Sequence, residues 1–366
     1  MRAAKPMHDR ELLYAALRDP STMVDLELAQ WDLLIRQARY ARLLGRLAVL
    51  LEERDLLECL PQKVRDHLTA ARVVARKNET TMRWEVDRVG KMLAPTGVPV
   101  ILLKGGAYVM AELPPARGRL YSDLDILVPK SQLSLVEQTL LEQGWEPQKL
   151  HPYDQRYYRQ WMHELPPLIH RQRRTSLDVH HTILPETGRL HPDPEKLFQA
   201  ARPLAGEWPK VLAPTDMILH SAAHLFQDGE LAGGLRDLTD LDDLLRHFGP
   251  QEGFWDQLVP RARELDLARP LFYALRYSQR CLESPVPDSV VDALRPTRPS
   301  WPVRFLMDAL VTRAMRPGHP DKTCWGSVLS TWLLYVRSHW LRMPPLLLAS
   351  HLFRKALRHW YEEEDD

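Results

Sequence analysis

One block of the chain, residues 98–182, carries the residue patterns of β-strands and lies between two longer helical regions. Residues 98–103 are apolar and β-branched at their start, which predicts a buried strand. Residues 122–128 alternate polar and apolar side chains, as half-buried strands do. Residues 165–170 and 175–182 predict a hairpin around a polar turn. The sheet that this chain can form is therefore small, and we expect these strands to lie in it together.

Two helices are expected between the strands of this block. Residues 107–113 follow the first strand, and residues 131–143 follow the second with helical spacing of their apolar side chains. Ser131 is the expected N-cap of the second helix, and Gly144 is its expected C-terminal stop. Each predicted strand of the first pair is thus followed by a helix.

Longer helical regions flank the block. In residues 9–92 the apolar side chains recur at helical spacing, and the last of these helices, residues 72–93, is expected to end before Gly97. After Pro214 the clearest helices are expected at residues 216–226, 235–248, 255–265, 270–281, 325–339 and 345–360.

The length and this layout predict an α+β fold with three parts. At 366 residues the chain can bury two packed units, or one core with helical extensions. We expect a helical N-terminal extension at residues 1–92, a core with a small mixed β-sheet at residues 93–184, and a helical C-terminal region at residues 185–366.

Charge and cysteine content argue against several classes of protein. The net charge of +1 gives no overall attraction to nucleic acid or to anionic lipid. The 3 cysteines are far apart and odd in number, which fits neither a disulfide framework nor a close-spaced zinc site. The first residues do not resemble a signal peptide, and no run reaches the ~18 apolar residues of a spanning helix. We therefore expect a cytoplasmic protein without stable membrane insertion.

Three aspartates fall on the predicted strands. Asp123 and Asp125 are two positions apart in one strand, so both side chains point to the same side of the sheet. Asp178 lies in a second strand, and it joins the same face if the two strands are neighbours. Carboxylates this close repel one another, and a divalent cation holds them ionised most easily. The pattern predicts a two-metal site for phosphate chemistry.

A glycine turn precedes the aspartate strand. Lys104, Gly105 and Gly106 follow the first strand and come just before a helix, where backbone N–H groups and the helix dipole favour a phosphate. Lys104 adds a positive charge to this turn.

The order of the motifs resembles that of the polymerase-β-like nucleotidyltransferase superfamily. The motifs are the glycine turn at Gly105 and Gly106, the strand Asp123-Leu-Asp125, and the later strand residue Asp178. More narrowly, the chain is similar to a bacterial nucleotidyltransferase family that is related to abortive-infection toxins and is often encoded near surface-polysaccharide genes.

The resemblance implies a function and a set of metal ligands. The function is metal-dependent transfer of a nucleoside monophosphate from a nucleoside triphosphate (NTP) to an acceptor hydroxyl on a small molecule, a saccharide, an RNA or a protein. Asp123, Asp125 and Asp178 would be the catalytic ligands of Mg²⁺ or Mn²⁺. Lys104, Gly105 and Gly106 would hold the phosphates.

Three further residues are candidate nucleotide contacts. Arg119 and Ser122 precede the aspartate strand and can bind phosphate oxygens, although Arg119 can also pair with a neighbouring acid. His180 shares a strand face with Asp178, and its alternative is a hydrogen-bonded structural histidine. The basic and aromatic stretch at residues 156–174 is either a patch for a polyanionic acceptor or a solvated hairpin edge.

Two functions other than nucleotidyl transfer to a metabolite fit the same residues. One is a non-catalytic module that senses nucleotide or docks a partner, and the other is a toxin-like nucleotidyltransferase that modifies RNA or protein.

In the C-terminal region, the pairs His220/His224 and Asp237/Asp240 have a spacing that could hold a metal, but packing or capping on a helix face is the preferred interpretation. The tryptophans of the last segment are expected in the core rather than at a membrane.

Overall fold

The computed structural model describes residues 11–148, 152–204, 208–227, 231, 234–318, 324–344 and 348. It confirms the α+β fold, with one mixed sheet of 7 strands in the order β3-β4-β5-β2-β1-β7-β6. The strands are β1 (Ile101–Leu102), β2 (Asp123–Leu127), β3 (Trp145–Pro147), β4 (Leu168–His170), β5 (Ser176–His180), β6 (Arg202–Pro203) and β7 (Lys210–Val211).

The centre of the sheet is formed by the strands that the alternation predicts. β2 pairs in parallel with β5, and this register sets Asp125 beside Asp178. β1 is antiparallel to β2, and β4 is antiparallel to β5 across the predicted hairpin. Parallel neighbours need a long crossover, and the chain between β2 and β5 provides one with two helices and two strands. The expectation that these strands share one sheet is confirmed.

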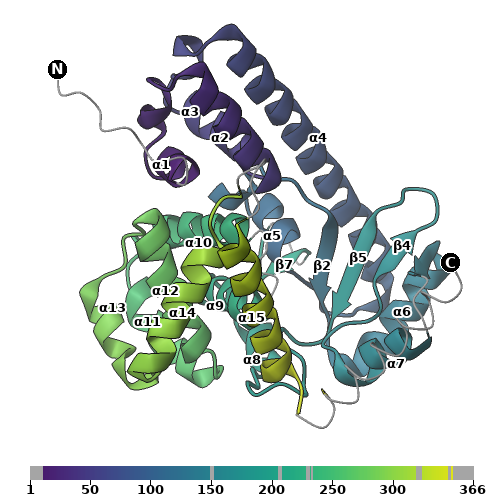
Figure 1. Ribbon diagram of the computed structural model, residues 1–366. Helices are drawn as coiled ribbons and strands as arrows, with labels where there is room; N and C mark the ends of the chain where they lie inside the picture. The colour runs from purple at the N-terminus through teal and green to yellow at the C-terminus, as the bar shows by residue number, and fades with distance from the viewer. Residues whose placement is uncertain are drawn as a thin grey trace, which may run out of the picture.

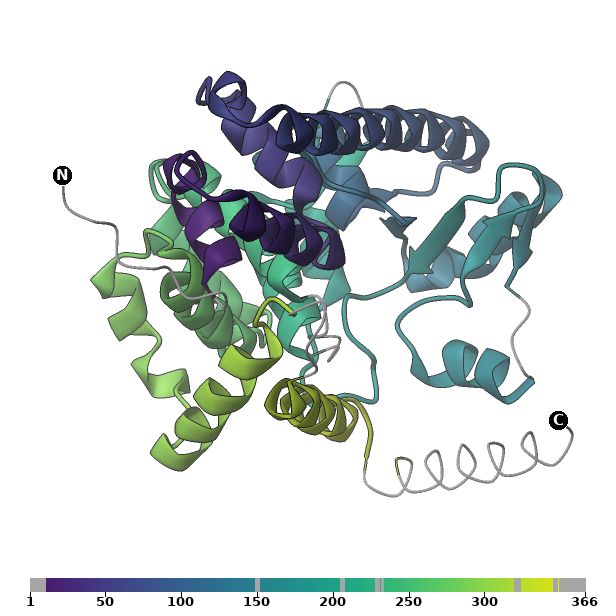
Figure 2. The same ribbon diagram turned by 45° about the horizontal axis from the view of Figure 1, so that its top comes forward.

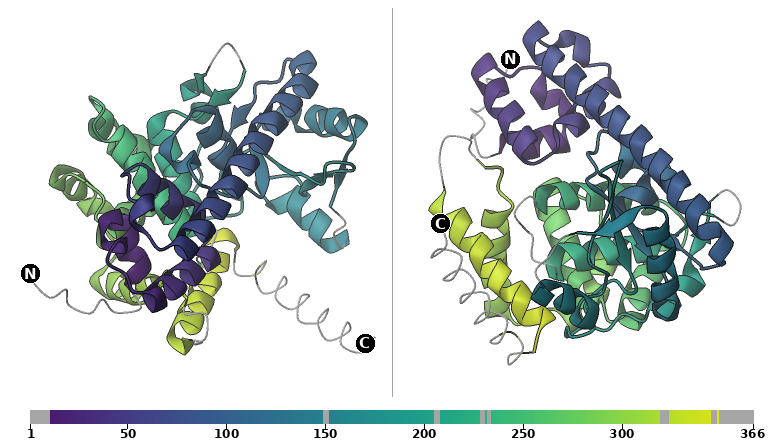
Figure 3. Two further views of the ribbon diagram at one scale, coloured as in Figure 1. Left: turned by 90° about the horizontal axis from the view of Figure 1, so that it is seen from above. Right: turned by 90° about the vertical axis from the view of Figure 1, so that its right-hand side faces the viewer.

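The N-terminal region is helical, as expected. It comprises α1 (Leu12–Arg18), α2 (Leu28–Tyr40), α3 (Leu44–Glu52) and the long α4 (Gln62–Leu93), with short 3-10 turns at Pro20–Met23 (η1), Leu57–Cys59 (η2) and Ala94–Thr96 (η3). α4 runs from the N-terminal helices to the sheet (Figures 1 and 3). Its Leu68 is buried among the N-terminal helices, whereas Val86 and Val89 are buried against the sheet. Gly97, in the left-handed region at φ +67°, follows it as the predicted stop.

The helices within the sheet block differ from expectation at their starts. They are α5 (Lys104–Met110), α6 (Leu133–Glu142) and α7 (Pro152–Trp161), with 3-10 turns at Pro114–Ala116 (η4) and Lys130–Gln132 (η5). The prediction of Ser131 as an N-cap is wrong, because Ser131 lies inside the 3-10 turn and Gln132 occupies the cap position. Gly144 ends α6 as predicted, with φ +89°. α5 begins at Lys104 itself rather than at residue 107.

The C-terminal region is mostly helical and packs beside the sheet (Figure 2), but it also contributes β6 and β7, so the sheet extends past residue 184. Its helices are α8 (Pro194–Ala200), α9 (Pro214–Gln227), α10 (Gly234–Phe248), α11 (Phe254–Glu264), α12 (Ala268–Leu282), α13 (Asp288–Ala293), α14 (Trp301–Ala314) and α15 (Trp325–Arg342), with the 3-10 turn Arg295–Thr297 (η6). α9 contacts α10, α11, α12 and α15. A single hydrophobic core joins these helices to the sheet, which fixes α9 and α10 relative to β2.

The tryptophans of α15 are not in the core, so this prediction is wrong for them. Trp325, Trp332 and Trp340 are exposed, and Trp360 lies outside the described residues. The buried side of α15 carries Leu334 with two serines instead, and the helix packs against α14 and α9. Among the described residues, no helix combines the length and apolar character needed to cross a bilayer.

Close packing against β2 explains the glycine at position 106 in α5. A Cβ atom on Gly106 would lie 2.7 Å from Cδ1 of Leu124, a buried residue of β2. We expect Gly106→Ala to lower the free energy of unfolding by about 1–3 kcal/mol, because the core cannot admit the extra methyl group without moving. Guanidinium denaturation measures this change. Gly326→Ala is the control, since its Cβ would meet nothing closer than 3.9 Å, and an unchanged Gly106→Ala would contradict the packing account.

Candidate active site

The three aspartates lie on one side of the two central strands. Asp123 and Asp125 are two residues apart on β2, and Asp178 of β5 is the register partner of Asp125. Neighbouring residues of a parallel pair point to the same face, so Asp178 extends the row that β2 begins. The negative charges of Asp125 and Asp123 both act on Asp178.

Asp125 is the buried centre of this row. Its Oδ1 accepts from Lys104 Nζ at 3.1 Å and lies 3.1 Å from Nε2 of His180. Burial alone would raise the pKa of Asp125, but Lys104 and His180 outweigh it and hold the pKa well below its usual range. Lys104 has φ +39°, a left-handed conformation that costs a non-glycine residue about 1–3 kcal/mol. Asp125 is therefore ionised and held in one orientation.

The environment of Asp178 favours the protonated carboxyl, whereas that of Asp125 favours the ionised form. The Oδ1 of Asp178 is shielded from solvent and has no hydrogen-bond partner among the described residues. Burial, with the charges of Asp125 and Glu164, raises the pKa of Asp178 to about 8. An unpartnered buried carboxylate oxygen beside two further carboxylates is a donor set that fits Mg²⁺ or Mn²⁺, because these ions prefer oxygen ligands.

The raised pKa of Asp178 gives the metal-free protein a pH-dependent stability. An unfolded carboxyl titrates near pH 4, so between about pH 4 and 8 the folded state holds one more proton than the unfolded state. The free energy of unfolding should therefore fall as pH rises through this window. Asp178→Asn has no proton to lose and should show a flatter profile. Guanidinium unfolding in EDTA at about pH 5 and about pH 8 gives the change of unfolding free energy with pH for each protein. An equal change in the wild type and in Asp178→Asn would contradict the prediction.

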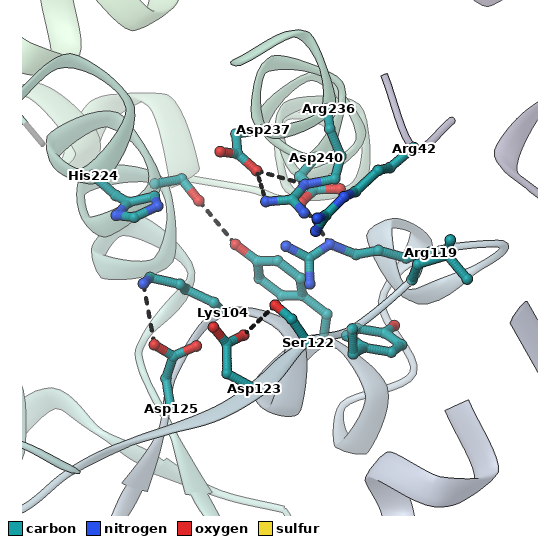
Figure 4. A pocket seen from close by; sticks show the side chains of 14 residues that line it. Arg42, Lys104, Arg119, Ser122, Asp123, Asp125, His224, Arg236, Asp237 and Asp240 are labelled. Atoms are coloured by element: carbon teal, nitrogen blue, oxygen red, sulfur yellow. Dashed lines mark hydrogen bonds and ion pairs between the residues drawn. The ribbon is translucent and has the colours of Figure 1, made fainter. Parts of the chain in front are cut away.

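A pocket of about 210 Å³ opens beside Asp123 and Asp125 (Figure 4). Its walls come from the loop after α2, from α5, from the segment before β2, and from α9 and α10. The lining residues are Arg42, Lys104, Tyr108, Arg119, Leu120, Tyr121, Ser122, Asp123, Asp125, Ser221, His224, Arg236, Asp237 and Asp240. Four of them are cations and four are carboxylates, and the two signs are interleaved, because Lys104 pairs with Asp125, Arg119 with Asp240 and Arg236 with Asp237.

Arg119 joins the sheet block to the C-terminal helices. Its Nε donates to Asp240 of α10 at 2.9 Å, and both side chains are only about one-tenth exposed. The guanidinium also lies over the rings of Tyr108 and Tyr121, at 5.8 and 5.2 Å from their centroids. The alternative in which Arg119 pairs with an acid is therefore observed, although the residue still lines the pocket.

Five of the nine residues expected at the site line this pocket: Lys104, Arg119, Ser122, Asp123 and Asp125. Ser122 Oγ donates to Asp123 Oδ1 at 3.1 Å.

The other four expected residues do not line the pocket. Gly105 and Gly106 are buried beneath it, and a Cβ on Gly105 would lie 2.5 Å from Arg119 Nη1. Asp178 lies beside Asp125, while His180 is buried with Nε2 at 3.1 Å from Asp125 Oδ1. His180 thus has the hydrogen-bonded position that was its alternative, and the phosphate role of the glycines stays a prediction.

Several pocket residues could not be assigned from the sequence. Arg42 comes from the N-terminal helices, and Arg236 comes from α10, where its Nη2 lies 2.8 Å from Asp237. The spacing of His220/His224 and of Asp237/Asp240 was a usable signal, but its interpretation as packing misses that His224, Asp237 and Asp240 face the pocket. Only the fold brings these distant segments together.

The basic stretch at residues 156–174 is largely neutralised by acids. Arg159 pairs with Glu137 at 2.5 Å, Arg173 pairs with Glu85 at 2.9 Å, and Arg171 pairs with Glu146. These contacts favour the structural interpretation of the stretch over an acceptor patch.

Comparison with known proteins gives one result. Residues 27–283 match the model of a protein family described as uncharacterised nucleotidyltransferase. The matched span covers the three aspartates and all of the pocket lining, from Arg42 to Asp240. None of the curated proteins and none of the solved structures matches the chain.

Proposed function

The chain belongs to a family of uncharacterised nucleotidyltransferases, and from this premise we propose that it transfers a nucleoside monophosphate from an NTP to an acceptor hydroxyl with Mg²⁺ or Mn²⁺. The observation that carries the proposal is the register of Asp125 beside Asp178, next to a pocket that opens at Asp123. Within the proposal, the chain is a member of the polymerase-β-like superfamily and a relative of the abortive-infection enzymes.

The three aspartates have separate roles in the proposed reaction. Asp123 and Asp125 would bind both of two divalent ions, and Asp178 would bind one of them. When bound, the ions would neutralise phosphate charge and acidify the acceptor hydroxyl. The hydroxyl oxygen bonds to the α-phosphorus, the bond from that phosphorus to the oxygen bridging to the β-phosphate breaks, and pyrophosphate leaves. Asp178 takes the proton of the hydroxyl. Its unpartnered oxygen beside Asp125 supports this role.

The cations of the pocket suit the triphosphate. Lys104 lines the pocket from the start of α5, Arg236 lines it from α10, and Arg42 lines it from the N-terminal loop. Their positive charges lie around the pocket that opens at Asp123, where a polyphosphate would otherwise be repelled by the aspartates. Backbone N–H groups of Gly105 and Gly106 are proposed to add to the phosphate contacts.

His180 and Arg119 are proposed to position other groups. The Nε2 of His180 contacts Asp125, and Arg119 connects α10 to the segment before β2.

The alternative function, a nucleotide sensor, would need only that a nucleotide occupies the pocket. The buried oxygen of Asp178 without a hydrogen bond is destabilising for such a module, and this supports an enzyme.

Binding of NTP should depend on the metal. Calorimetry of ATP, GTP, CTP and UTP in Mg²⁺ and in EDTA tests this, and for the preferred nucleotide we expect at least about a tenfold loss of affinity in EDTA, which corresponds to about 1.4 kcal/mol. The reason is repulsion between the triphosphate and the aspartate row. Asp123→Asn should reduce the metal dependence, whereas Asp32→Asn, at an exposed position on α2, should leave it unchanged. Equal affinity in EDTA would count against the proposed function.

A further inference from the structure

A second cluster of metal-binding side chains lies behind Asp125. It consists of His163, Glu164 and His180, whose ligand atoms all lie within 4.8 Å of one another. The first two residues belong to the segment between α7 and β4, and the third ends β5. Backbone pairing aligns them, because Leu165 N donates to Val179 O at 2.9 Å and Glu164 forms a β-bridge with His180. Residues opposite each other in such a bridge present their side chains to one face.

The cluster is enclosed by protein. His163 is 7% exposed and His180 is 2% exposed, while the Glu164 side chain is 15% exposed. The two imidazole rings lie 5.2 Å apart at a tilt of 32°. Glu164 is therefore the member of the cluster that is most exposed to solvent.

Both ring nitrogens of His180 face carboxylates. Nε2 lies 3.1 Å from Asp125 Oδ1, and Nδ1 lies 3.3 Å from Glu164 Oε2. A protonated imidazole carries two N–H groups and can donate to both carboxylates, so in the metal-free protein a proton can lie between Nδ1 and Oε2. A metal ion between Nδ1 and Oε2 would take the place of that proton, while the Nε2–H still donates to Asp125.

The observed geometry suits such an ion. Two ligands at about 2.0–2.1 Å from a tetrahedral Zn²⁺ are separated by roughly 3.3–3.4 Å. The separation of Nδ1 and Oε2 is 3.3 Å. A metal-bound histidine almost always donates its other N–H to a carboxylate or carbonyl, which is the place that Asp125 occupies.

We propose that His163, Glu164 and His180 bind one Zn²⁺ that clamps the α7–β4 connection to the end of β5. Two imidazoles with one carboxylate select Zn²⁺ over Mg²⁺, whereas the all-oxygen row of Asp123, Asp125 and Asp178 has the opposite preference. The ion fixes the ring of His180 and through it the carboxylate of Asp125. This site is independent of the proposed function, because metal content and spectrum report it without any assay of transfer.

The test is metal binding by untagged full-length protein. After removal of metal with a chelator, the wild type should take up one Zn²⁺ per chain and should give a tetrahedral Co²⁺ spectrum without the thiolate charge-transfer band that a cysteine ligand produces. Glu164→Gln and His163→Asn should weaken Zn²⁺ binding by more than about 100-fold. Mutation of a residue that only hydrogen-bonds to a metal ligand already lowers metal affinity by about 10–100-fold. Asp123→Asn should bind Zn²⁺ as the wild type does.

His247→Gln is the matched control, because His247 is an exposed histidine at the end of α10. It should retain the full Zn²⁺ content and the Co²⁺ spectrum. The proposal is overturned if the wild type gives no tetrahedral Co²⁺ spectrum, or if Glu164→Gln binds Zn²⁺ as tightly as the wild type. Circular dichroism shows whether each variant is folded. If a variant is not folded, the Co²⁺ spectrum of the wild type alone decides whether the site exists.

Discussion

Asp178→Asn should lower nucleotidyl transfer by roughly 10²–10⁴-fold while nucleotide still binds. The change keeps the shape of the side chain but removes the charge that would hold the second metal and the oxygen that would accept the proton. Asp123 and Asp125 remain, and the pocket beside them is not lined by Asp178. Calorimetry of NTP binding and single-turnover transfer, measured on the same preparation, separate the two effects.

The comparison for Asp178→Asn needs folded protein saturated with nucleotide. The raised pKa of Asp178 shows that its ionised form is unfavourable in the folded metal-free protein. Asp178→Asn is therefore expected to raise the melting temperature, and thermal stability alone is not a sign of function. Asp32→Asn, at an exposed position, serves as the control for an aspartate change of the same kind. Wild-type transfer by Asp178→Asn would exclude the role assigned to this residue. Full cellular effect of the variant would favour a nucleotide sensor.

Arg119→Ala should destabilise the fold by about 3–5 kcal/mol, as expected when one partner of a buried ion pair is removed. Asp240 would then be left as a buried carboxylate facing Asp237, and burial already raises the pKa of Asp240 to about 6. Two aromatic contacts to the guanidinium would also be lost. Guanidinium denaturation measures the change at equilibrium.

Two variants calibrate the result for Arg119. Arg36→Ala removes an exposed pair with Asp32 on α2 and should cost no more than about 1 kcal/mol. Replacing both Arg119 and Asp240 by leucine should cost less than Arg119→Ala alone, because no charge is left unpaired. A loss for Arg119→Ala as small as that for Arg36→Ala would contradict the view that this pair joins the sheet to α10.

The central strands were predictable because their signal is local. Alternation over residues 122–128 and 175–182 set the faces of β2 and β5, and it placed Asp125 and Asp178 on them. Only the adjacency of the two strands had to be assumed, and the structure confirms it and shows that the pair is parallel. The helical flanks were predictable for the same reason, since their apolar spacing is also a local property.

The walls of the pocket were not predictable because they depend on contacts between distant segments. Arg42 and Asp240 line the same pocket as Asp125 only because the N-terminal helices and α10 both pack beside the sheet block. The same limit explains the error for Trp332, whose exposure depends on which side of α15 meets its neighbour. Burial of His180 between Asp125 and Glu164 likewise follows from backbone pairing that no local pattern encodes.

The most direct test of the proposed reaction follows the fate of each phosphate. The protein is incubated with Mg²⁺, a cell lysate and one NTP at a time, labelled either at the α-phosphate or at the γ-phosphate. An acceptor should gain label only from the α-position, the γ-label should be released as pyrophosphate, and Asp178→Asn should lose the transfer. Label that reaches an acceptor from the γ-phosphate, or α-label transferred equally by Asp178→Asn, would contradict nucleotidyl transfer by this site.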